Sequence, residues 1–297
     1  MSDRRLTPYD WVVVVYSAGV AILILATHAR VPDWWLYAGV HAAVAASCIG
    51  MALWNPRNRL LSFLHDWDVA VYIPVLFFMT CVLAHRVHPV DYDAQLIAID
   101  RRIGGIAVLK WMEKIQTSAL TTASKSVWIA YYFLTLVPGI PLYLRRRSGF
   151  LEAKLLVVLS FLVSYAGYFA LPAQGPGYFQ QEIGVAQPRF EESKVASSMK
   201  RTIYELEGEA RDTFPSGHVM IAAMTIVLLV RNRLWRTCLI GVPFALGVIW
   251  STMYLRYHYL IDGIAGLALV ALIAWLAPKW QRRACQPALF MRASPPS

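Results

Sequence analysis

The chain has 297 residues, of which 58% are apolar and only 15% are charged. This composition excludes an ordinary water-soluble domain, because apolar stretches of roughly twenty residues recur, each long enough to cross a hydrocarbon core of about 30 Å. The net charge of +10 does not indicate nucleic-acid binding, since the basic residues form short clusters between apolar stretches, a pattern that orients membrane proteins. The sequence therefore predicts an all-α polytopic membrane protein.

About eight transmembrane helices are expected in chain order. They cover residues 11–29, 33–54, 67–86, 126–144, 151–171, 217–231, 236–255 and 259–277. We interpret 1–66 as an N-terminal two-helix extension, 67–277 as a six-helix membrane core and 278–297 as a tail. The first stretch lacks a convincing signal-peptide cleavage site, so a retained helix is expected there.

Basic clusters in the short connections predict the orientation of these helices. The clusters are Arg4 and Arg5; Arg57 and Arg59; 145–147; Arg231, Arg233 and Arg236; and Lys279, Arg282 and Arg283. With eight spans all five fall on one side, which predicts that both termini are cytoplasmic. The two long loops, about 87–125 and 172–215, then face outward.

The first long loop has the pattern of an interfacial helix. Apolar residues recur at three- and four-residue steps from Leu96 to Ile115, with charged residues between them. A break is expected at Gly104 and Gly105. We interpret this segment as a lid on the membrane surface rather than as a part of the chemistry.

Two short segments carry residues suited to catalysis. His258 and Asp262 are four residues apart and share one face of a helix, where the carboxylate can orient the imidazole as a nucleophile or base. Ser216, Gly217 and His218 open an apolar helix. There Ser216 can cap the helix, the first backbone N–H groups can bind an anion, and His218 can deliver a proton.

Each of these features also has a structural alternative. His258 and Asp262 could be a structural pair closing a helix start, and Ser216 could be a cap without catalysis. Arg256 could bind phosphate with its planar guanidinium or extend towards lipid headgroups. The four cysteines of the chain show no spacing typical of a disulfide framework or a metal site.

The motifs resemble those of the type 2 phosphatidic acid phosphatase (PAP2) superfamily. The matching stretches are 214–218 (FPSGH) and 251–263 (STMYLRYHYLIDG). Residues 167–176 (GYFALPAQGP), and Asp100 followed by Gly104 and Gly105, are similar to the branch that contains inositol phosphorylceramide synthase. The resemblance covers about 67–277, without the first two helices.

The resemblance implies a role for each matching residue. His258 would be the nucleophile that forms a phosphohistidine, Asp262 would orient it, and His218 would be the general acid for the leaving alkoxide. Ser216 and the Gly217 amide would hold the phosphoryl oxygens. No metal or other cofactor is implied, because helix-end amides and basic side chains take the part that magnesium has elsewhere.

The sequence departs from the better-known phosphatases at two places. Thr252 stands where they have arginine, and their first motif, with its lysine and arginine, has no match. Arg256 is expected to replace part of the missing charge. Further candidates for phosphate or substrate binding are Asp100, Gly175, Pro176, Lys194, Lys200, Arg201 and Arg211.

These observations predict an integral-membrane enzyme acting on a lipid phosphate or phospholipid at the non-cytoplasmic face of a bacterial plasma or inner membrane. Hydrolysis of a lipid phosphate is the first hypothesis, and transfer of a phosphorylated headgroup between lipids is the second. Two further alternatives stay open. One is a non-catalytic lipid transporter or scramblase, and the other is a metal site formed by the two histidines and the aspartate.

Overall fold

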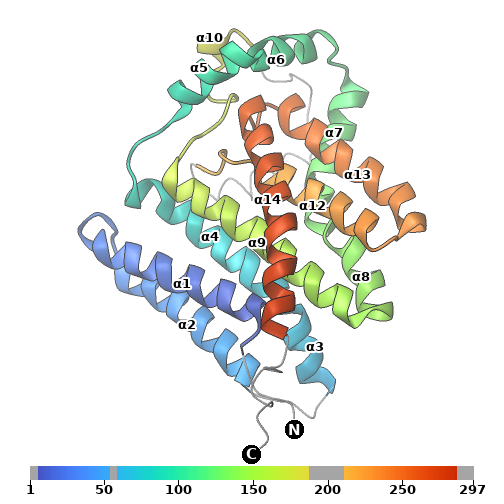
Figure 1. The fold of residues 1–297 in the computed structure, drawn as a ribbon. Helices are drawn as coiled ribbons and strands as arrows, with labels where there is room; N and C mark the ends of the chain where they lie inside the picture. The colour runs from blue at the N-terminus through green and yellow to red at the C-terminus, as the bar shows by residue number, and fades with distance from the viewer. Residues whose placement is uncertain (1–5, 54–58, 187–210, 286–297) are drawn as a thin grey trace, which may run out of the picture.

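A computed structural model describes residues 6–53, 59–186 and 211–285 (Figure 1). Within these ranges the regular elements are helices. They are α1 (Pro8–Ala26), η1 (His28–Arg30), α2 (Trp34–Leu53), α3 (Arg59–Trp67), α4 (Val69–Val87), α5 (Asp93–Ile103), α6 (Gly105–Lys114), α7 (Ser118–Ala130), η2 (Tyr131–Phe133), α8 (Leu136–Arg145), α9 (Arg147–Ala170), α10 (Gln180–Ile183), α12 (Gly217–Arg231), α13 (Trp235–Tyr254) and α14 (Leu260–Cys285).

The helices confirm the predicted membrane architecture. In the described part of the chain, seven stretches are long and apolar enough to cross a membrane, and the shorter apolar helix α12 coincides with the eighth expected span, which stays a prediction. One of the seven is the continuous stretch Ser118–Arg145, which contains α7, η2 and α8. The short helix α3 was not expected, because the residues between the second and third expected spans were interpreted as a connection.

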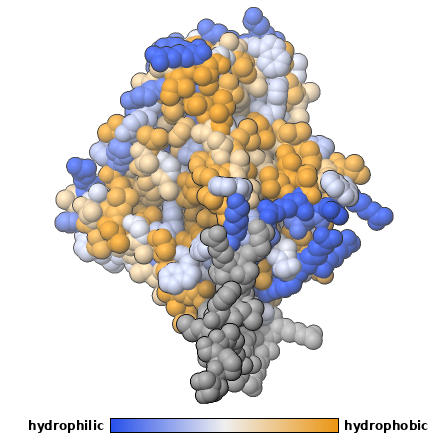
Figure 2. Space-filling model, in the orientation of Figure 1, coloured by the Kyte–Doolittle hydropathy of each residue, from blue (hydrophilic) through white to orange (hydrophobic). Residues whose placement is uncertain are grey.

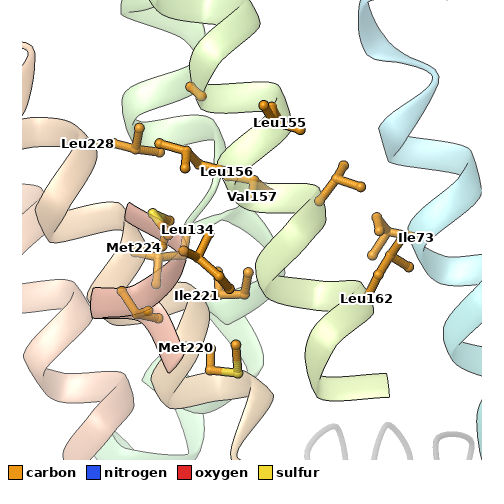
Figure 3. Packing of buried hydrophobic residues seen from close by; sticks show 14 of the residues in the cluster. Ile73, Leu134, Leu155, Leu156, Val157, Leu162, Met220, Ile221, Met224 and Leu228 are labelled. Atoms are coloured by element: carbon orange, nitrogen blue, oxygen red, sulfur yellow. The ribbon is translucent and has the colours of Figure 1, made fainter. Parts of the chain in front are cut away.

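Helix α9 forms the centre of the bundle. It packs against α1, α4, α8, α12 and α14, and Figure 3 shows apolar side chains of α9 and α12 in contact there. Leu155 and Leu156 of α9 and Met220 and Ile221 of α12 are almost fully buried. Close packing of this kind holds helices together in a membrane, where lipid tails are as apolar as leucine. This core positions the start of α12.

The outer surface of the bundle is strongly apolar. Figure 2 shows hydrophobic residues over the middle of one face, with hydrophilic residues towards its upper and lower ends. Leu144, Leu239 and Ile240 each have 73–77% of their surface exposed. Large apolar side chains exposed in such number mark a surface that faces lipid rather than water.

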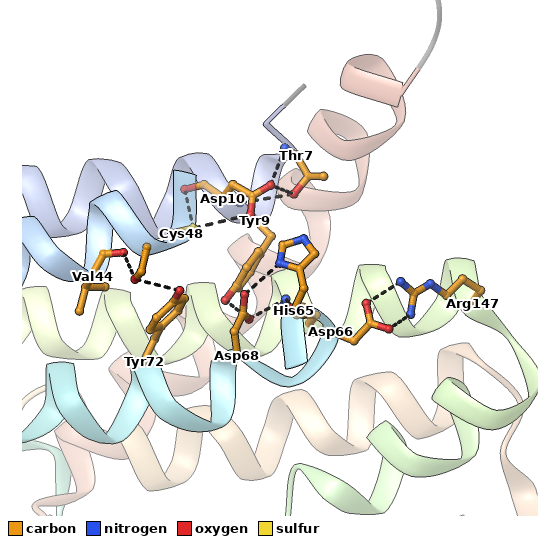
Figure 4. A network of polar contacts seen from close by, with 12 residues as sticks. Thr7, Tyr9, Asp10, Val44, Cys48, His65, Asp66, Asp68, Tyr72 and Arg147 are labelled. Carbon is orange, nitrogen blue, oxygen red and sulfur yellow. Dashed lines mark hydrogen bonds and ion pairs between the residues drawn. The ribbon is translucent and has the colours of Figure 1, made fainter. Parts of the chain in front are cut away.

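A buried polar network joins the N-terminal helices to the core (Figure 4). The Lys154 ammonium of α9 lies 2.7 Å from the Asp68 carboxylate and 3.8 Å from the centre of the Tyr9 ring. The Tyr9 hydroxyl donates a hydrogen bond of 2.6 Å to Asp68, and Arg147 pairs with Asp66 beside them. Since each charge has a partner, the network can stay buried. The predicted domain boundary at 66/67 stays a prediction.

The two ends of the bundle differ. The start of α1 and the end of α14 lie at one end, where Thr7 and Gln281 line a common cavity of about 210 Å³. Helices α5 and α6 lie at the other end (Figure 1), and the break between them falls at Gly104, whose φ is +86°. The predicted break of the first long loop is therefore confirmed. Contact with a membrane surface stays a prediction.

Candidate active site

Ser216 begins α12 as the sequence predicts. Its hydroxyl accepts a hydrogen bond of 3.3 Å from the Val219 backbone N–H, which confirms the N-cap. The Gly217 N–H donates to the Tyr168 hydroxyl at 3.2 Å. A Cβ atom on Gly217 would lie only 2.6 Å from that hydroxyl oxygen. A larger residue here would therefore require Tyr168 to shift, and the predicted phosphate-binding role of Gly217 stays a prediction.

The two histidine rings face each other across the gap between α12 and the turn before α14. The Nε2 atom of His258 lies 3.4 Å from Nδ1 of His218, and Nδ1 of His258 lies 2.9 Å from the Thr213 backbone carbonyl oxygen. Because a carbonyl can only accept, Nδ1 of His258 carries the proton and Nε2 keeps its lone pair. The structure thus brings together the two histidines that the sequence analysis selected.

The environment of His258 keeps its ring neutral. Only 3% of the residue is exposed. Burial lowers the pKa of His258 to about 4, although the Asp212 carboxylate and the hydrogen bond to Thr213 act in the opposite direction. A neutral imidazole with a free Nε2 is the form that acts as a nucleophile.

Asp262 lies beside His258 but has a second partner. Its Oδ2 atom accepts a hydrogen bond of 2.7 Å from the Tyr259 N–H and lies 3.5 Å from Nδ1 of His258. Its Oδ1 atom is buried and has no hydrogen-bond partner among the described residues. The carbonyl of Thr213, rather than Asp262, is the closer acceptor for the ring. The predicted orienting role of Asp262 stays a prediction.

Arg256 uses most of its donors on backbone carbonyls. Only 1% of the residue is exposed, and its φ is +65°. Its terminal nitrogens donate to the carbonyl oxygens of Met253, Tyr254 and Leu109, which join the end of α13 to α6. Burial lowers the pKa of the Arg256 guanidinium. Its Nε atom has no partner among the described residues, and the predicted phosphate-binding role stays a prediction.

Asp100 of α5 binds the start of α14. Its two carboxylate oxygens accept hydrogen bonds of 3.0 and 2.9 Å from the N–H groups of Leu260 and Ile261. The carboxylate is fully buried, and burial raises the pKa of Asp100. A Cβ atom on Gly105 would lie 2.1 Å from one carboxylate oxygen. In the structure Asp100 therefore caps a helix of the site, and its candidate role in substrate binding stays a prediction.

Gly175 and Pro176 lie in a loop that Asp93 holds against the site. The Asp93 carboxylate accepts from the N–H groups of Gln174 and Gly175, at 2.9 Å each, and from the Tyr259 hydroxyl at 3.0 Å. Gly175 has a φ of +97°, a conformation that favours glycine. Gly175 and Pro176 are both buried. Helix α5 thus fixes two segments of the site. The amphipathic pattern of this part of the sequence predicted a lid and did not indicate such a role.

The remaining basic candidates separate into two groups. Arg211 pairs with Asp91, with nitrogen–oxygen distances of 3.0 and 3.2 Å. Lys194, Lys200 and Arg201 lie outside the described residues. Their role in substrate binding stays a prediction.

Sequence reasoning missed the aromatic surroundings of His218. The ring centre of Trp128 on α7 lies 5.5 Å from that of His218. The ring centre of Tyr131 lies 4.3 Å from that of His218. Tyr257 contacts Trp128 at 4.7 Å between ring centres. Trp128 and Tyr131 belong to an apolar span, where aromatic residues usually face lipid or the core, so no pattern distinguished them.

Two comparisons with known proteins give significant matches. The profile of the PAP2 superfamily matches residues 94–276. A protein of Bacteroides thetaiotaomicron named phosphoinositol dihydroceramide synthase is 26% identical over 268 residues, which cover 78% of this chain and 86% of that protein. No solved structure shows significant similarity to the chain.

Proposed function

Because the chain belongs to the PAP2 superfamily, we propose that it is an integral-membrane enzyme that cleaves a phosphoester through a phosphohistidine on His258. The observation that carries this proposal is the pair of ring contacts of His258. Its Nδ1–H is held by the Thr213 carbonyl, and its Nε2 lone pair faces His218. A nucleophile and a proton donor thus share one buried site.

The reaction has two steps with balanced proton transfers. In the first, Nε2 of His258 forms a bond to phosphorus while the bond to the alkoxide leaving group breaks, and a protonated His218 gives its proton to that alkoxide. In the second, neutral His218 takes the proton of an acceptor alcohol, whose oxygen displaces His258 from phosphorus. Asp262, 3.5 Å from Nδ1 of His258, stabilises the charge on the modified ring.

Transfer to a lipid alcohol is the favoured outcome, ahead of the hydrolysis that was the first hypothesis from the sequence. The similar protein of B. thetaiotaomicron is named as a synthase, and this supports the transfer of a phosphoinositol-type headgroup to a ceramide-type lipid. Burial of His258 and Asp262 also supports transfer, because limited access of water protects a phosphohistidine from hydrolysis.

We also place the site on the non-cytoplasmic side of the membrane. The basic clusters predict cytoplasmic termini. The start of α1 and the end of α14 lie at the end of the bundle opposite to α5 and α6, which cover the site (Figure 1). A substrate lipid would then reach His258 from the outer leaflet.

Product analysis of the purified enzyme tests the proposal. Phosphatidylinositol is incubated with and without dihydroceramide, and the lipids and phosphate are identified by mass spectrometry. A new phosphoinositol lipid is expected only with the acceptor. Free phosphate or inositol phosphate as the sole product contradicts transfer, and the absence of any turnover with a range of phospholipids favours the transporter hypothesis.

Variants test the mechanism in the same assay. His258→Ala is expected to abolish turnover and the acid-labile phosphoryl label on the protein, whereas the control His28→Ala, at an exposed histidine, keeps both. Turnover is also expected to persist with a chelator, since the proposed steps use only side chains and backbone. Full activity of His258→Ala would refute the phosphohistidine mechanism, and loss of activity on chelation would support a metal site.

A further inference from the structure

Trp128 lies between a candidate catalytic ring and the turn after α13. Its indole is nearly parallel to the His218 ring, with 24° between the planes and 5.5 Å between the centres. The planes of the Trp128 and Tyr257 rings differ by 30°, and the ring centres lie 4.7 Å apart. Trp128 is half-buried and packs beside the apolar cluster of Met112, Tyr254 and Leu255. Its ring therefore forms a wall of the site.

The indole N–H of Trp128 is buried and has no hydrogen-bond acceptor among the described residues. A buried donor without an acceptor is unfavourable, and native structures contain few of them. A tryptophan in a membrane protein usually places this N–H at the polar interface, whereas here the indole ring stacks on His218. An oxygen of a bound ligand would remove the deficit.

We propose that Trp128 is a substrate-binding residue whose Nε1–H donates a hydrogen bond to an oxygen of the phosphorylated headgroup. The inference rests on the proposed function, since it assumes that a phosphoester binds beside His218. The ligand class fits the chemistry, because an indole N–H can only donate and the oxygen atoms of a phosphodiester and of a polyol can accept. The flat ring at the same time limits the position of the headgroup against His218.

Trp250 provides a matched control. Its indole N–H is also buried without an acceptor among the described residues. Its ring, however, stacks on Tyr254 at 5.8 Å and meets Trp111 at 6.0 Å, and no ring contact joins it to His218 or His258 in the described structure. The two tryptophans therefore share the missing acceptor and the packing against Met112, Tyr254 and Leu255, and they differ in the ring contact with His218.

The test compares Trp128→Phe with Trp250→Phe in the transfer assay. Trp128→Phe keeps an aromatic wall and removes the N–H, so KM for phosphatidylinositol should rise about tenfold or more, the usual effect of losing a hydrogen bond to a charged oxygen. The value of kcat should change less. Trp250→Phe should leave KM within about twofold, an estimate for a residue outside the site. Equal KM changes in the two variants would contradict the inference.

Inhibition by orthovanadate identifies the oxygen that is bound. If the indole N–H binds a phosphoryl oxygen, Trp128→Phe weakens vanadate inhibition by a factor similar to the change in KM. If it binds a headgroup hydroxyl, vanadate inhibition is unchanged while KM rises. Both results support the inference and distinguish its two forms. An unchanged KM together with unchanged vanadate inhibition overturns it.

A second variant covers the case in which Trp128→Phe does not fold. Incorporation of benzothienylalanine at position 128 preserves the shape of the ring system and replaces N–H by sulfur, so the same rise in KM is expected. Phosphoryl labelling of wild-type His258 separates the two proposals. Without that label the proposed function fails. If the label on His258 is present, a wild-type KM for the benzothienylalanine protein refutes only the role of Trp128.

Discussion

Replacing Asp100 by Asn tests whether α5 stabilises the catalytic end of α14. The Asp100 carboxylate accepts two backbone N–H groups, those of Leu260 and Ile261, at 3.0 and 2.9 Å. These groups belong to the first turn of α14, where no earlier turn can supply an acceptor. The first turn also contains Asp262, so this cap links α5 to the candidate site.

The expected loss of stability follows from the two hydrogen bonds. Asparagine keeps one acceptor oxygen but turns an NH₂ group towards the second backbone donor. Losing one charge-assisted hydrogen bond costs about 1.5–3 kcal/mol, and removing a negative charge from a helix start costs about 0.3–2 kcal/mol. Burial raises the pKa of Asp100, so relief of the buried charge offsets part of the sum. A net loss of roughly 2 kcal/mol is expected for Asp100→Asn.

Thermal unfolding in detergent measures this loss. A thiol-reactive dye reports exposure of Cys48 and Cys81, which are 0% and 8% exposed in the folded protein. A loss of this size should lower Tm by roughly 5 °C. Asp100→Ala, which removes both acceptors, should lower it further, and turnover should fall with it because the first turn of α14 loosens.

Asp33→Asn is the control for this prediction. Asp33 is exposed and has a φ of +54°, a conformation that asparagine tolerates well. The Tm of Asp33→Asn should stay within about 1 °C of that of the wild type, as is usual for exposed positions. If Asp100→Asn were as stable as Asp33→Asn and equally active, the cap would have no energetic role and the reasoning would be refuted.

Three further predictions concern His258 and the loop of Gly175. The His258 pKa of about 4 lies below the ordinary value near 6.5, so the loss of kcat/KM that follows protonation of His258 should be centred near pH 4. Stability should decrease as the pH falls from about 6.5 to 4, because the unfolded imidazole binds its proton first. An acidic limb centred near pH 6.5 would contradict this. Gly175→Ala should greatly reduce activity, because its Cβ atom would lie 2.5 Å from the Tyr257 carbonyl oxygen at a φ of +97°. Gly39→Ala should not change activity, because its Cβ atom would have no atom within 4 Å. Equal activity of the two variants would contradict the close packing of the Gly175 loop against Tyr257.

Local sequence patterns identified much of this architecture. The apolar stretches predicted the spans, because the thickness of a bilayer sets their length. The break at Gly104 was predictable because glycine interrupts an amphipathic pattern. The N-cap at Ser216 was predictable because capping depends on residues within one turn. The position of α3 was missed, since nine residues between two spans look like a connection.

The sequence by itself determined the all-α membrane class and selected His218 and His258 as candidates. Those conclusions rest on hydropathy and on spacing within single segments. Only the tertiary structure decided the closest acceptor for His258, which is the Thr213 carbonyl 45 residues away in the chain. It also decided that Trp128 stacks on His218. Contacts of this kind depend on how separate helices pack, and no local pattern along the chain encodes which backbone carbonyl or indole ring will meet a given histidine.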